Sequence, residues 1–510
     1  MNRLPPAARI ALLPALALLA LLAWMFASPI GAGADDDFHL VSTWCASPVA
    51  AEFCAPTGDP DTRDVPDDLV EVACFVGNPE RSAACQAELW ASDTRIDTDR
   101  GNWDRQYPPV YYAVNGLLAG ADIQTSALLM RLLTVVLFLG LTVALYALLP
   151  VARRPALLWT WVITTLPLGL SLFGSNNPSA WAMIGVGSAF FALLGYFETV
   201  GRTRVALGAL FAASVVIAAG SRGDAALYAG FAIVLVLGLT VVRSRAYLLQ
   251  AILPLAMGLV ALAFFLSARQ VNSGLNGFAG GGSAPAGPGG GDLSDSLTGF
   301  ALLAYNLLNV PFLWSGVLGT WGLGWLDVSL PWVVPLGIIA TFAAVGFTGL
   351  GLKTRRTTIA VLATFVVLWA LPVYVLQAGG DAVGEQVQPR YLFPLIILLA
   401  GLLMLTPAGR ALRLERVPAL LVATVLTGAH FIALHFDIRR YVTGIDGAAP
   451  NLDAGAEWWW TGPLGPTAVW LLGSVAYGVL MFLIVPRLAA GRPPAPLSAA
   501  PQRGGATAAL

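Results

Sequence analysis

The chain has 510 residues, of which 57% are hydrophobic and only 11% are charged, and its formal net charge is -1. Soluble domains are about 45–50% apolar and about 25% charged, so this composition excludes a water-soluble fold. The arginines are spread along the chain in short clusters between apolar segments. Such a distribution offers no basic surface for nucleic acid, and we expect no nucleic-acid partner.

Apolar runs long enough to cross a bilayer recur from one end of the chain to the other. A transmembrane helix needs about 20 such residues. We therefore predict an all-α polytopic membrane protein with about twelve transmembrane helices. The expected spans are residues 10–28, 127–150, 156–174, 178–198, 205–220, 225–242, 246–266, 331–350, 357–376, 391–407, 417–435 and 467–485.

The orientation follows from the basic residues of the short loops, because positive charge is retained in the cytoplasm. These residues fall in every second connection, which predicts that both termini are cytoplasmic. The clusters are Arg153 and Arg154, Arg202 and Arg204, Arg243 and Arg245, Lys353 with Arg355 and Arg356, and Arg410, Arg413 and Arg416. Residues 1–34 also resemble a cleavable signal peptide, but the apolar stretch is longer than the usual 7–15 residues, and we favour an uncleaved anchor.

The spans divide the chain into six regions. An anchor helix (1–28) precedes a large extracytoplasmic loop (29–126) and a first transmembrane block (127–267). A second extracytoplasmic loop (268–330) combines a flexible Gly-rich part with re-entrant or interfacial helices, because residues 297–326 are apolar but interrupted by Asn, Pro and Gly. A second transmembrane block (331–486) and a disordered cytoplasmic tail (487–510) complete the chain.

All four cysteines, Cys45, Cys54, Cys74 and Cys85, lie in the first extracytoplasmic loop. Disulfides are expected on that side of a membrane. Pairing of Cys45 with Cys54 and of Cys74 with Cys85 is the most local of three connectivities, although spacing cannot choose among them. We expect the bonds to staple the loop.

The densest acidic cluster, Asp35, Asp36 and Asp37 followed by His39, begins just after the first span. A carboxylate held at a membrane surface can accept the proton of an acceptor hydroxyl, and nearby apolar surface raises its basicity. The alternative is a solvated, acidic start of a loop.

Four arginines run against the positive-inside trend: Arg131, Arg222, Arg269 and Arg390. An arginine within a span costs roughly 2.5–3.5 kcal/mol on insertion scales, so Arg131 should have a partner such as a carboxylate or a lipid phosphate. A guanidinium matches phosphate oxygens bidentately and would stabilise a phosphate leaving group. The alternative for each arginine is a side chain that reaches to the lipid headgroups.

Four segments in order resemble the bacterial membrane-protein family called domain of unknown function 2142, which looks like a branch of the C-type (GT-C) glycosyltransferase superfamily. They are Asp35-Asp36-Asp37-Phe38-His39-Leu40, Tyr107-Pro108-Pro109-Val110-Tyr111-Tyr112, Gly322-Leu323-Gly324-Trp325-Leu326-Asp327 and Gln388-Pro389-Arg390-Tyr391-Leu392-Phe393-Pro394. The first motif of the family usually reads Asp-Glu-Pro-Ala-His, so Asp37-Phe38 replaces Pro-Ala here. This departure leaves open which aspartate points into the site.

The resemblance implies a GT-C-like bundle in the bacterial plasma membrane that uses a polyprenyl-phosphate sugar as donor. Asp36 or Asp35 would deprotonate a hydroxyl of an envelope glycan or lipid acceptor, with Asp37 and His39 in support, and the configuration at the anomeric carbon would invert. Arg390, Arg222, Arg131 and Arg269 would hold the donor phosphate. Asp35, Asp36 and His39 could share a divalent ion such as Mg²⁺ or Mn²⁺, although no cofactor is required. The substrate would be lined by Tyr107, Tyr111, Trp325, Asp327 and Tyr391.

Two other functions remain open. A transporter or flippase for lipid-linked sugars also needs many spans and phosphate-binding arginines, but such proteins usually have repeated halves and charged groups near the midplane. A non-catalytic partner in envelope assembly would instead leave Asp35 and Asp36 facing bulk water.

Overall fold

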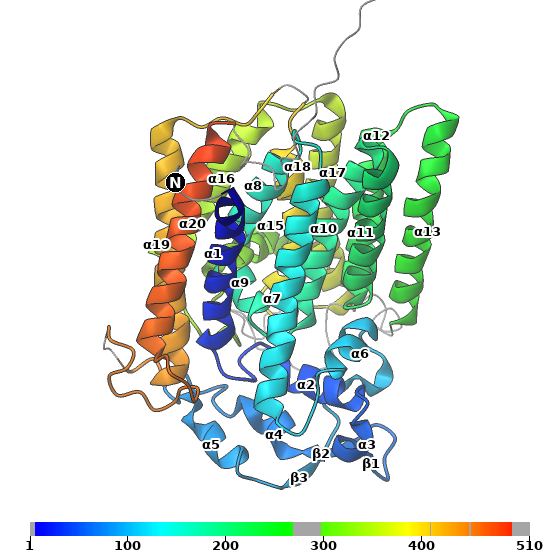
Figure 1. Cartoon of the computed structure of the whole chain (residues 1–510). Helices are drawn as coiled ribbons and strands as arrows, with labels where there is room; N and C mark the ends of the chain where they lie inside the picture. The colour runs from blue at the N-terminus through cyan, green and yellow to red at the C-terminus, as the bar shows by residue number, and fades with distance from the viewer. Residues whose placement is uncertain (1–5, 269–296, 408–409, 448–449, 492–510) are drawn as a thin grey trace, which may run out of the picture.

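The structure is a computed structural model that describes residues 6–268, 297–407, 410–447 and 450–491. Long helices form a bundle, and the segment from residue 28 to residue 122 folds against one end of it, as Figure 1 shows. We call residues 28–122 the loop layer. The bundle helices are α1 (Pro6–Ala27), α7 (Ile123–Leu148), α8 (Arg154–Thr164), α9 (Pro167–Phe173), α10 (Pro178–Glu198), α11 (Gly201–Ala219), α12 (Gly223–Thr240), α13 (Arg245–Ser267), α15 (Gly299–Ser315), α16 (Val333–Leu350), α17 (Arg355–Gly379), α18 (Pro389–Met404), α19 (Arg416–Val442) and α20 (Pro466–Ala489).

The prediction of an all-α polytopic membrane protein is confirmed. Among the described residues, 10 helices are long and apolar enough to cross a membrane, or 11 if the bent pair α8 and α9 counts as one span. Two shorter apolar stretches, Ala11–Ala27 of α1 and Pro389–Met404 of α18, are not in that count. The predicted total of about twelve included both of these helices and did not include α15.

The helix pair α8 and α9 is bent by 94° at a break of two residues. Pro167 begins α9, and a proline disfavours helical backbone at the residue before it, which is Leu166 here. The expected span 156–174 is therefore broken inside the bundle. The break turns α9 across the bundle beside the first residues of α18, where the site described below is found.

The centre of the bundle is formed by α10 and α18, whose residues are almost all buried. Small residues allow the helices to approach closely, as is common in membrane bundles. At Gly185 of α10, for example, a Cβ would lie 2.6 Å from the backbone nitrogen of Ala218 in α11. Close backbone contact therefore holds α10 against α11, and α18 packs against α10 at the same centre.

The basic loops meet at the end of the bundle opposite the loop layer. Arg153 pairs with Glu198 at 2.6 Å and donates to the carbonyl of Thr406, while Lys353 donates to the carbonyls of Leu403 and Leu405. The basic loops that alternate along the sequence thus lie on one face of the molecule. That this face is cytoplasmic stays a prediction from the positive-inside rule.

The loop layer has its own small core and a short antiparallel sheet. Its helices are α2 (Asp36–Cys45), α3 (Ala50–Phe53), α4 (Asp67–Val70), α5 (Gln86–Leu89) and α6 (Val110–Gly116), and its strands β1 (Ala55–Pro56), β2 (Arg63–Pro66) and β3 (Arg95–Thr98) lie in the order β1-β2-β3. Val41 and Trp44 of α2 pack into the layer with Val65 and Leu69. The other side of α2 carries His39 toward α6, so α2 connects the layer to the site.

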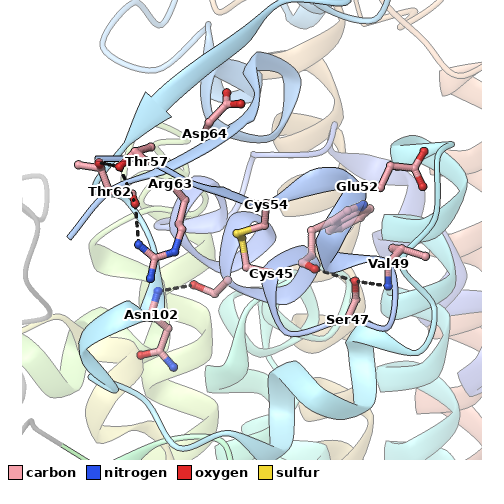
Figure 2. The surroundings of a disulfide bond; sticks show 12 residues. Cys45, Ser47, Val49, Glu52, Cys54, Thr57, Thr62, Arg63, Asp64 and Asn102 are labelled. Atoms are coloured by element: carbon pink, nitrogen blue, oxygen red, sulfur yellow. Dashed lines mark hydrogen bonds between the residues drawn. A yellow bond between two sulfur atoms is a disulfide. The ribbon is translucent and has the colours of Figure 1, made fainter. Parts of the chain in front are cut away.

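Two disulfides close local loops of this layer. Cys45 bonds Cys54 and Cys74 bonds Cys85, the most local of the three connectivities considered. The first bond joins the end of α2 to the end of α3 and lies beside β2, as Figure 2 shows. It therefore limits how far the end of α2 can move from the sheet.

Helix α15 and the turn after it (Gly316–Thr320) form the segment in which re-entrant or interfacial helices were predicted. Gly299 lies at the end of α17, because its carbonyl accepts from Gln377 Nε2 at 3.4 Å. The chain then returns to the loop layer, where Trp325 Nε1 donates to the carbonyl of Gly31 at 2.8 Å. The helical segment Gly299–Thr320 is also long and apolar enough to cross a membrane. The re-entrant arrangement therefore stays a prediction.

Arg440, near the end of α19, ties three parts of the chain together. Its guanidinium pairs with Asp327 at 2.7 Å and donates to the carbonyls of Phe75 at 3.0 Å and Arg81 at 2.7 Å. The side chain is fully buried. The second disulfide loop and the Gly322–Asp327 segment are thus both anchored on one bundle helix.

Replacing Arg440 with Met should lower the stability of the protein by about 3–5 kcal/mol, because it leaves the Asp327 carboxylate buried without its counter-ion. Apparent unfolding midpoints in detergent measure this change. Arg439→Met is the matched control, since among the described residues the Arg439 side chain donates to the nearby carbonyl of Ile445 alone. Equal midpoints for the two variants would contradict the anchoring role.

Candidate active site

The acidic motif begins with a residue in an unusual backbone conformation. Asp35 precedes α2 with φ 65 and ψ 16, in the left-handed region. Aspartate tolerates this region better than most residues, but the conformation is still uncommon outside glycine. It turns the Asp35 carboxylate away from α2 and toward the start of α18.

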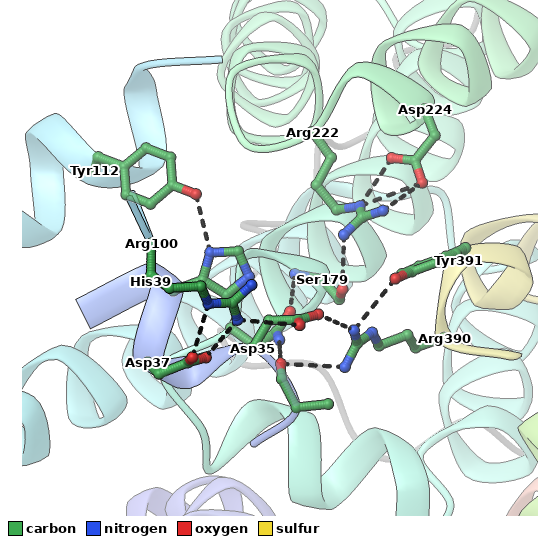
Figure 3. A network of polar contacts seen from close by, with 12 residues as sticks. Asp35, Asp37, His39, Arg100, Tyr112, Ser179, Arg222, Asp224, Arg390 and Tyr391 are labelled. Carbon is green, nitrogen blue, oxygen red and sulfur yellow. Dashed lines mark hydrogen bonds and ion pairs between the residues drawn. The ribbon is translucent and has the colours of Figure 1, made fainter. Parts of the chain in front are cut away.

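Asp35 and Arg390 form the central ion pair of the site, which Figure 3 shows. Arg390 Nη2 lies 2.5 Å from Asp35 Oδ2, and Nη1 donates to the carbonyl of Ala34 at 3.2 Å. Arg390 is 6% exposed, and the Asp35 side chain is 19% exposed. Burial alone would raise the pKa of Asp35, but the nearby charges, led by Arg390, outweigh burial and hold the pKa below its ordinary value.

Asp37 is held on the other side by an arginine that the sequence analysis did not identify. Arg100, which follows β3, donates from Nε and Nη2 to the two oxygens of Asp37 at 2.9 and 2.8 Å. Its Nη2 is also 3.7 Å from Asp35 Oδ1. The Asp35 carboxylate therefore lies between two guanidinium groups. No motif marks Arg100, because 63 residues separate it from Asp37 along the chain.

Asp36 points away from this pair. It is 0% exposed, and its Oδ2 accepts from the backbone nitrogen of Gly33 at 3.0 Å, while Oδ1 has no partner among the described residues. Burial raises the pKa of Asp36 to about 7, and Arg131 opposes the rise only in part. Of the two predicted bases, Asp35 is thus the one that meets Arg390.

His39 lies in an aromatic cluster on the side of α2 that faces the bundle. Its Nδ1 is 2.9 Å from the Tyr112 hydroxyl, and its ring packs edge-on against Tyr107 at 5.2 Å. Burial lowers the pKa of His39 well below its ordinary value, and the opposing effect of Asp35 does not compensate. The ring is therefore neutral at pH 7 and orients its neighbours by hydrogen bonding and packing.

Arg222 reaches the same region from the start of α12, but its charge is already paired. It donates from Nε and Nη2 to the oxygens of Asp224, both at 2.9 Å, and lies 4.5 Å above the ring of Tyr391 and 5.5 Å from that of Tyr107. Such stacking is favourable for a guanidinium. Arg222 and Tyr391 lie beside the Asp35–Arg390 pair (Figure 3), and together with Tyr107 they form a wall of the site.

Arg131 is fully buried, and its donors go to the end of α1. It donates to the carbonyls of Met25, Ser28 and Pro29 at 3.0, 2.8 and 2.7 Å, and to Asn176 Oδ1 at 2.9 Å. A cation at the end of a helix satisfies carbonyls that lack partners in the helix itself. We predicted a carboxylate or a lipid phosphate as the partner of Arg131, whereas the structure gives it Asn176 and backbone carbonyls at and just after the end of α1. No phosphate is needed to explain its burial. Arg269 lies outside the described residues.

The predicted lining residues are divided between the site and its supports. Tyr107 and Tyr391 border the site, and Tyr111 packs edge-on against Trp181 at 5.3 Å. Trp325 and Asp327 bond Gly31 and Arg440, so they fasten the third motif to the loop layer. Their contacts are structural, although their segment borders the cavity described next.

A small cavity of about 30 Å³ lies beside the ion pair. By comparison with the 10–15 Å³ that one water needs on the same measure, it has room for about two water molecules. It is lined by Gly33, Ala34, Leu168, Ser171, Leu172, Ser175, Gly316, Trp321, Gly322, Gly324, Leu326, Gln388, Pro389 and Arg390. Three of the four motif regions thus meet at one hollow, together with the broken helix α9.

The candidate metal ligands do not converge. Among the described residues, no group of three His, Cys, Asp or Glu side chains is arranged to hold a metal ion. Asp35 faces Arg390, Asp36 faces Gly33, and His39 faces Tyr112. The arrangement does not fit the predicted Asp35, Asp36 and His39 ligand set.

The raised pKa of Asp36 leads us to expect that the stability of the protein depends on pH. The pKa of about 7 in the folded protein lies above the value of about 3.9 in an unfolded chain. Between these values the folded state binds a proton that the unfolded state releases, so this group lowers stability as the pH rises from about 4 to about 7. Asn can still accept from Gly33. In Asp36→Asn the free energy of unfolding should therefore fall less between pH 5 and pH 8, by on the order of 2 kcal/mol, and unfolding midpoints measured across this range follow the change.

The control for this measurement is Asp35→Asn, for which the sign is opposite. The pKa of Asp35 is lowered in the folded state, so its ion pair stabilises the protein above the unfolded pKa, and its loss should lower the midpoint at both pH 5 and pH 8. Parallel pH profiles of the wild type and Asp36→Asn would refute the assignment of Asp36 as the buried acid.

A family model described as a predicted membrane protein (DUF2142) matches residues 18–399 of the chain. This range includes all four motif segments named above. No curated protein and no solved structure matches the chain.

Proposed function

We propose that this chain, which belongs to the DUF2142 family of predicted membrane proteins, is a membrane glycosyltransferase. It would move a sugar from a polyprenyl-phosphate donor to a glycan or lipid acceptor of the bacterial cell envelope, on the extracytoplasmic side. The observation that carries the proposal is the ion pair of Asp35 and Arg390 beside a cavity at the loop-layer end of the bundle. A base and a phosphate-binding cation are the two groups that such a transfer requires.

Asp35 is the proposed base. Its carboxylate takes the proton of the acceptor hydroxyl while the hydroxyl oxygen attacks the anomeric carbon. The bond from that carbon to the phosphate oxygen breaks, and its electron pair leaves with polyprenyl phosphate. An attack in line with the leaving group inverts the anomeric configuration. Asp35 is favoured over Asp36 because Asp36 is 0% exposed and bonded to Gly33.

Arg390 is the proposed phosphate ligand, and its pairing with Asp35 couples donor binding to basicity. With Arg390 and Arg100 beside it, Asp35 has a lowered pKa and is a weak base. A donor phosphate on Arg390 would offset the positive charge that lowers this pKa. The pKa of Asp35 would then rise, so the base becomes effective when the donor is present.

The neighbouring arginines support this arrangement with different roles. Arg100 holds Asp37 bidentately and keeps the start of α2 in place. Arg222, paired with Asp224 and stacked on Tyr391, is proposed to maintain the wall of the site. Arg131 is proposed to fix the end of α1, from which the acidic motif emerges. These roles leave Arg390 as the principal phosphate ligand among the described arginines.

A flippase for lipid-linked sugars is the second candidate, and one observation favours it. Broken helices are common at transporter sites, and α8 and α9 are bent by 94° next to the cavity. Transporters, however, place their charged groups near the midplane, whereas the Asp35–Arg390 pair lies beside the loop layer. The transferase therefore accounts for more of the site.

Donor turnover tests the proposal. Purified protein in lipid nanodiscs is incubated with a panel of polyprenyl-phosphate sugars and envelope acceptors, and released polyprenyl phosphate is measured. Asp35→Asn should lower turnover by about 10²- to 10⁴-fold, the usual contribution of a general base, while still binding the donor. Arg390→Ala should lose both binding and turnover, and Arg390→Lys should recover little because the ammonium lacks the planar fork.

The matched control is Asp97→Asn, an exposed aspartate on β3 that should behave as the wild type. If the donor is moved across a vesicle membrane but not consumed, the flippase is the correct function. If no donor in the panel is bound or consumed by the wild type, the transferase proposal fails.

A further inference from the structure

Two buried N–H donors at the cavity have no partner among the described residues. They are the Nε2 group of Gln388 and the Nε group of Arg390. Gln388 is 1% exposed, and both residues line the cavity. A buried donor without an acceptor costs about 1–3 kcal/mol, so two such donors at one hollow indicate that an acceptor belongs there.

The electrostatic character of the cavity favours an anion. Arg390 is the one charged residue among the described residues that line it, and none of them is an acid. Asp35 already pairs with this guanidinium through Nη2, so an anion at the cavity would share Arg390 with Asp35. Leu168 and Leu172 of α9 line another part of the same cavity. With room for about two water molecules, the cavity can admit the oxygens of an anionic head group but not an apolar chain as well.

The guanidinium of Arg390 offers different edges to different groups. Its Nη1 and Nη2 atoms contact Ala34, Asp35 and Tyr391, whereas its Nε is buried without a partner among the described residues. One arginine can therefore bind the carboxylate and a second acceptor at the same time. Gln388 lies two residues earlier, at the residue that precedes α18, and supplies a neutral donor to the same cavity.

We infer that Gln388 and the Nε edge of Arg390 form an oxyanion subsite that binds the phosphate group of a lipid phosphate. The inference rests on the proposed function, since it identifies where the donor phosphate would lie. It adds Gln388 as a ligand that selects a phosphate by hydrogen bonding without adding charge.

Gln388→Glu is the informative variant. The new carboxylate would have nearly the same shape and would repel a phosphate. Because a buried carboxylate can destabilise the fold, phosphate binding is compared at a temperature below the unfolding midpoint of every variant. Gln388→Leu removes the donor without adding charge and should have a smaller effect.

Gln377→Glu provides the matched control. Gln377 lies at the end of α17 and donates to the carbonyl of Gly299, away from the residues that line the cavity. It receives the same chemical change, so a general effect of one more carboxylate would appear in both variants.

The experiment measures binding of a sugar-free polyprenyl phosphate, and in a separate arm inorganic phosphate, to the full chain in nanodiscs. We expect the wild type and Gln377→Glu to bind the lipid phosphate equally. Gln388→Glu should bind it at least tenfold more weakly, and Gln388→Leu a few-fold more weakly. Unfolding midpoints of all variants are measured in parallel.

The outcomes separate this inference from the proposed function. Equal lipid-phosphate binding by Gln388→Glu and the wild type would overturn the subsite while leaving the transferase intact. Binding of inorganic phosphate alone, weakened in Gln388→Glu, would support an oxyanion subsite but overturn the lipid ligand. If the wild type binds neither compound, both the subsite and the proposed donor are wrong.

Discussion

The structure depends on one constraint, namely that an arginine buried in an apolar bundle must find acceptors for all its donors. A charge without partners in such surroundings is very costly. Arg131 and Arg440 meet this requirement, and Arg390 meets it only in part, by binding segments distant in the sequence. Arg131 binds the end of α1, Arg390 binds the acidic motif, and Arg440 binds both the second disulfide loop and the Gly322–Asp327 segment. These contacts hold the loop layer against the bundle.

Among these arginines, Arg390 differs in that its set of partners is incomplete. The donors of Arg131 are used by the carbonyls of α1 and by Asn176, and Arg440 is similarly surrounded. Arg390 has a carboxylate partner, but its Nε has no partner among the described residues, and the residue lines a cavity. An N–H donor without an acceptor does not stabilise the fold, whereas an arginine that binds a ligand needs a donor that is not used by the protein. The difference separates the candidate site from the supporting contacts around it.

The proposed mechanism uses this shared guanidinium. An aspartate that pairs with arginine is a weak base, and one that is released from arginine is a stronger base. If donor binding releases Asp35 from Arg390, Asp35 takes the proton of the acceptor hydroxyl only when the donor phosphate, which is the leaving group, is in position. The strained conformation of Asp35 fits such a role, because uncommon backbone angles are often found at functional sites.

The amino-acid sequence by itself determined the fold class, most of the spans and the face on which the basic loops gather. These properties depend on hydrophobic length and charge along a local stretch of chain. The sequence also singled out Asp35, Arg390 and the local disulfide pairs as candidates. It could not choose between Asp35 and Asp36, because the two residues are adjacent and of the same type. Their side chains point in different directions only because Asp35 has a left-handed backbone conformation.

Only the tertiary structure decided which arginines meet ligands and which support the fold. In the sequence, Arg131 and Arg390 are alike as cations near apolar spans. Their partners are set by segments more than 100 residues away. Arg100 and Gln388 gain their importance in the same way, through neighbours that no local pattern specifies. Hydrophobic periodicity is a property of nearby residues, whereas satisfaction of a buried charge depends on the packing of the whole bundle.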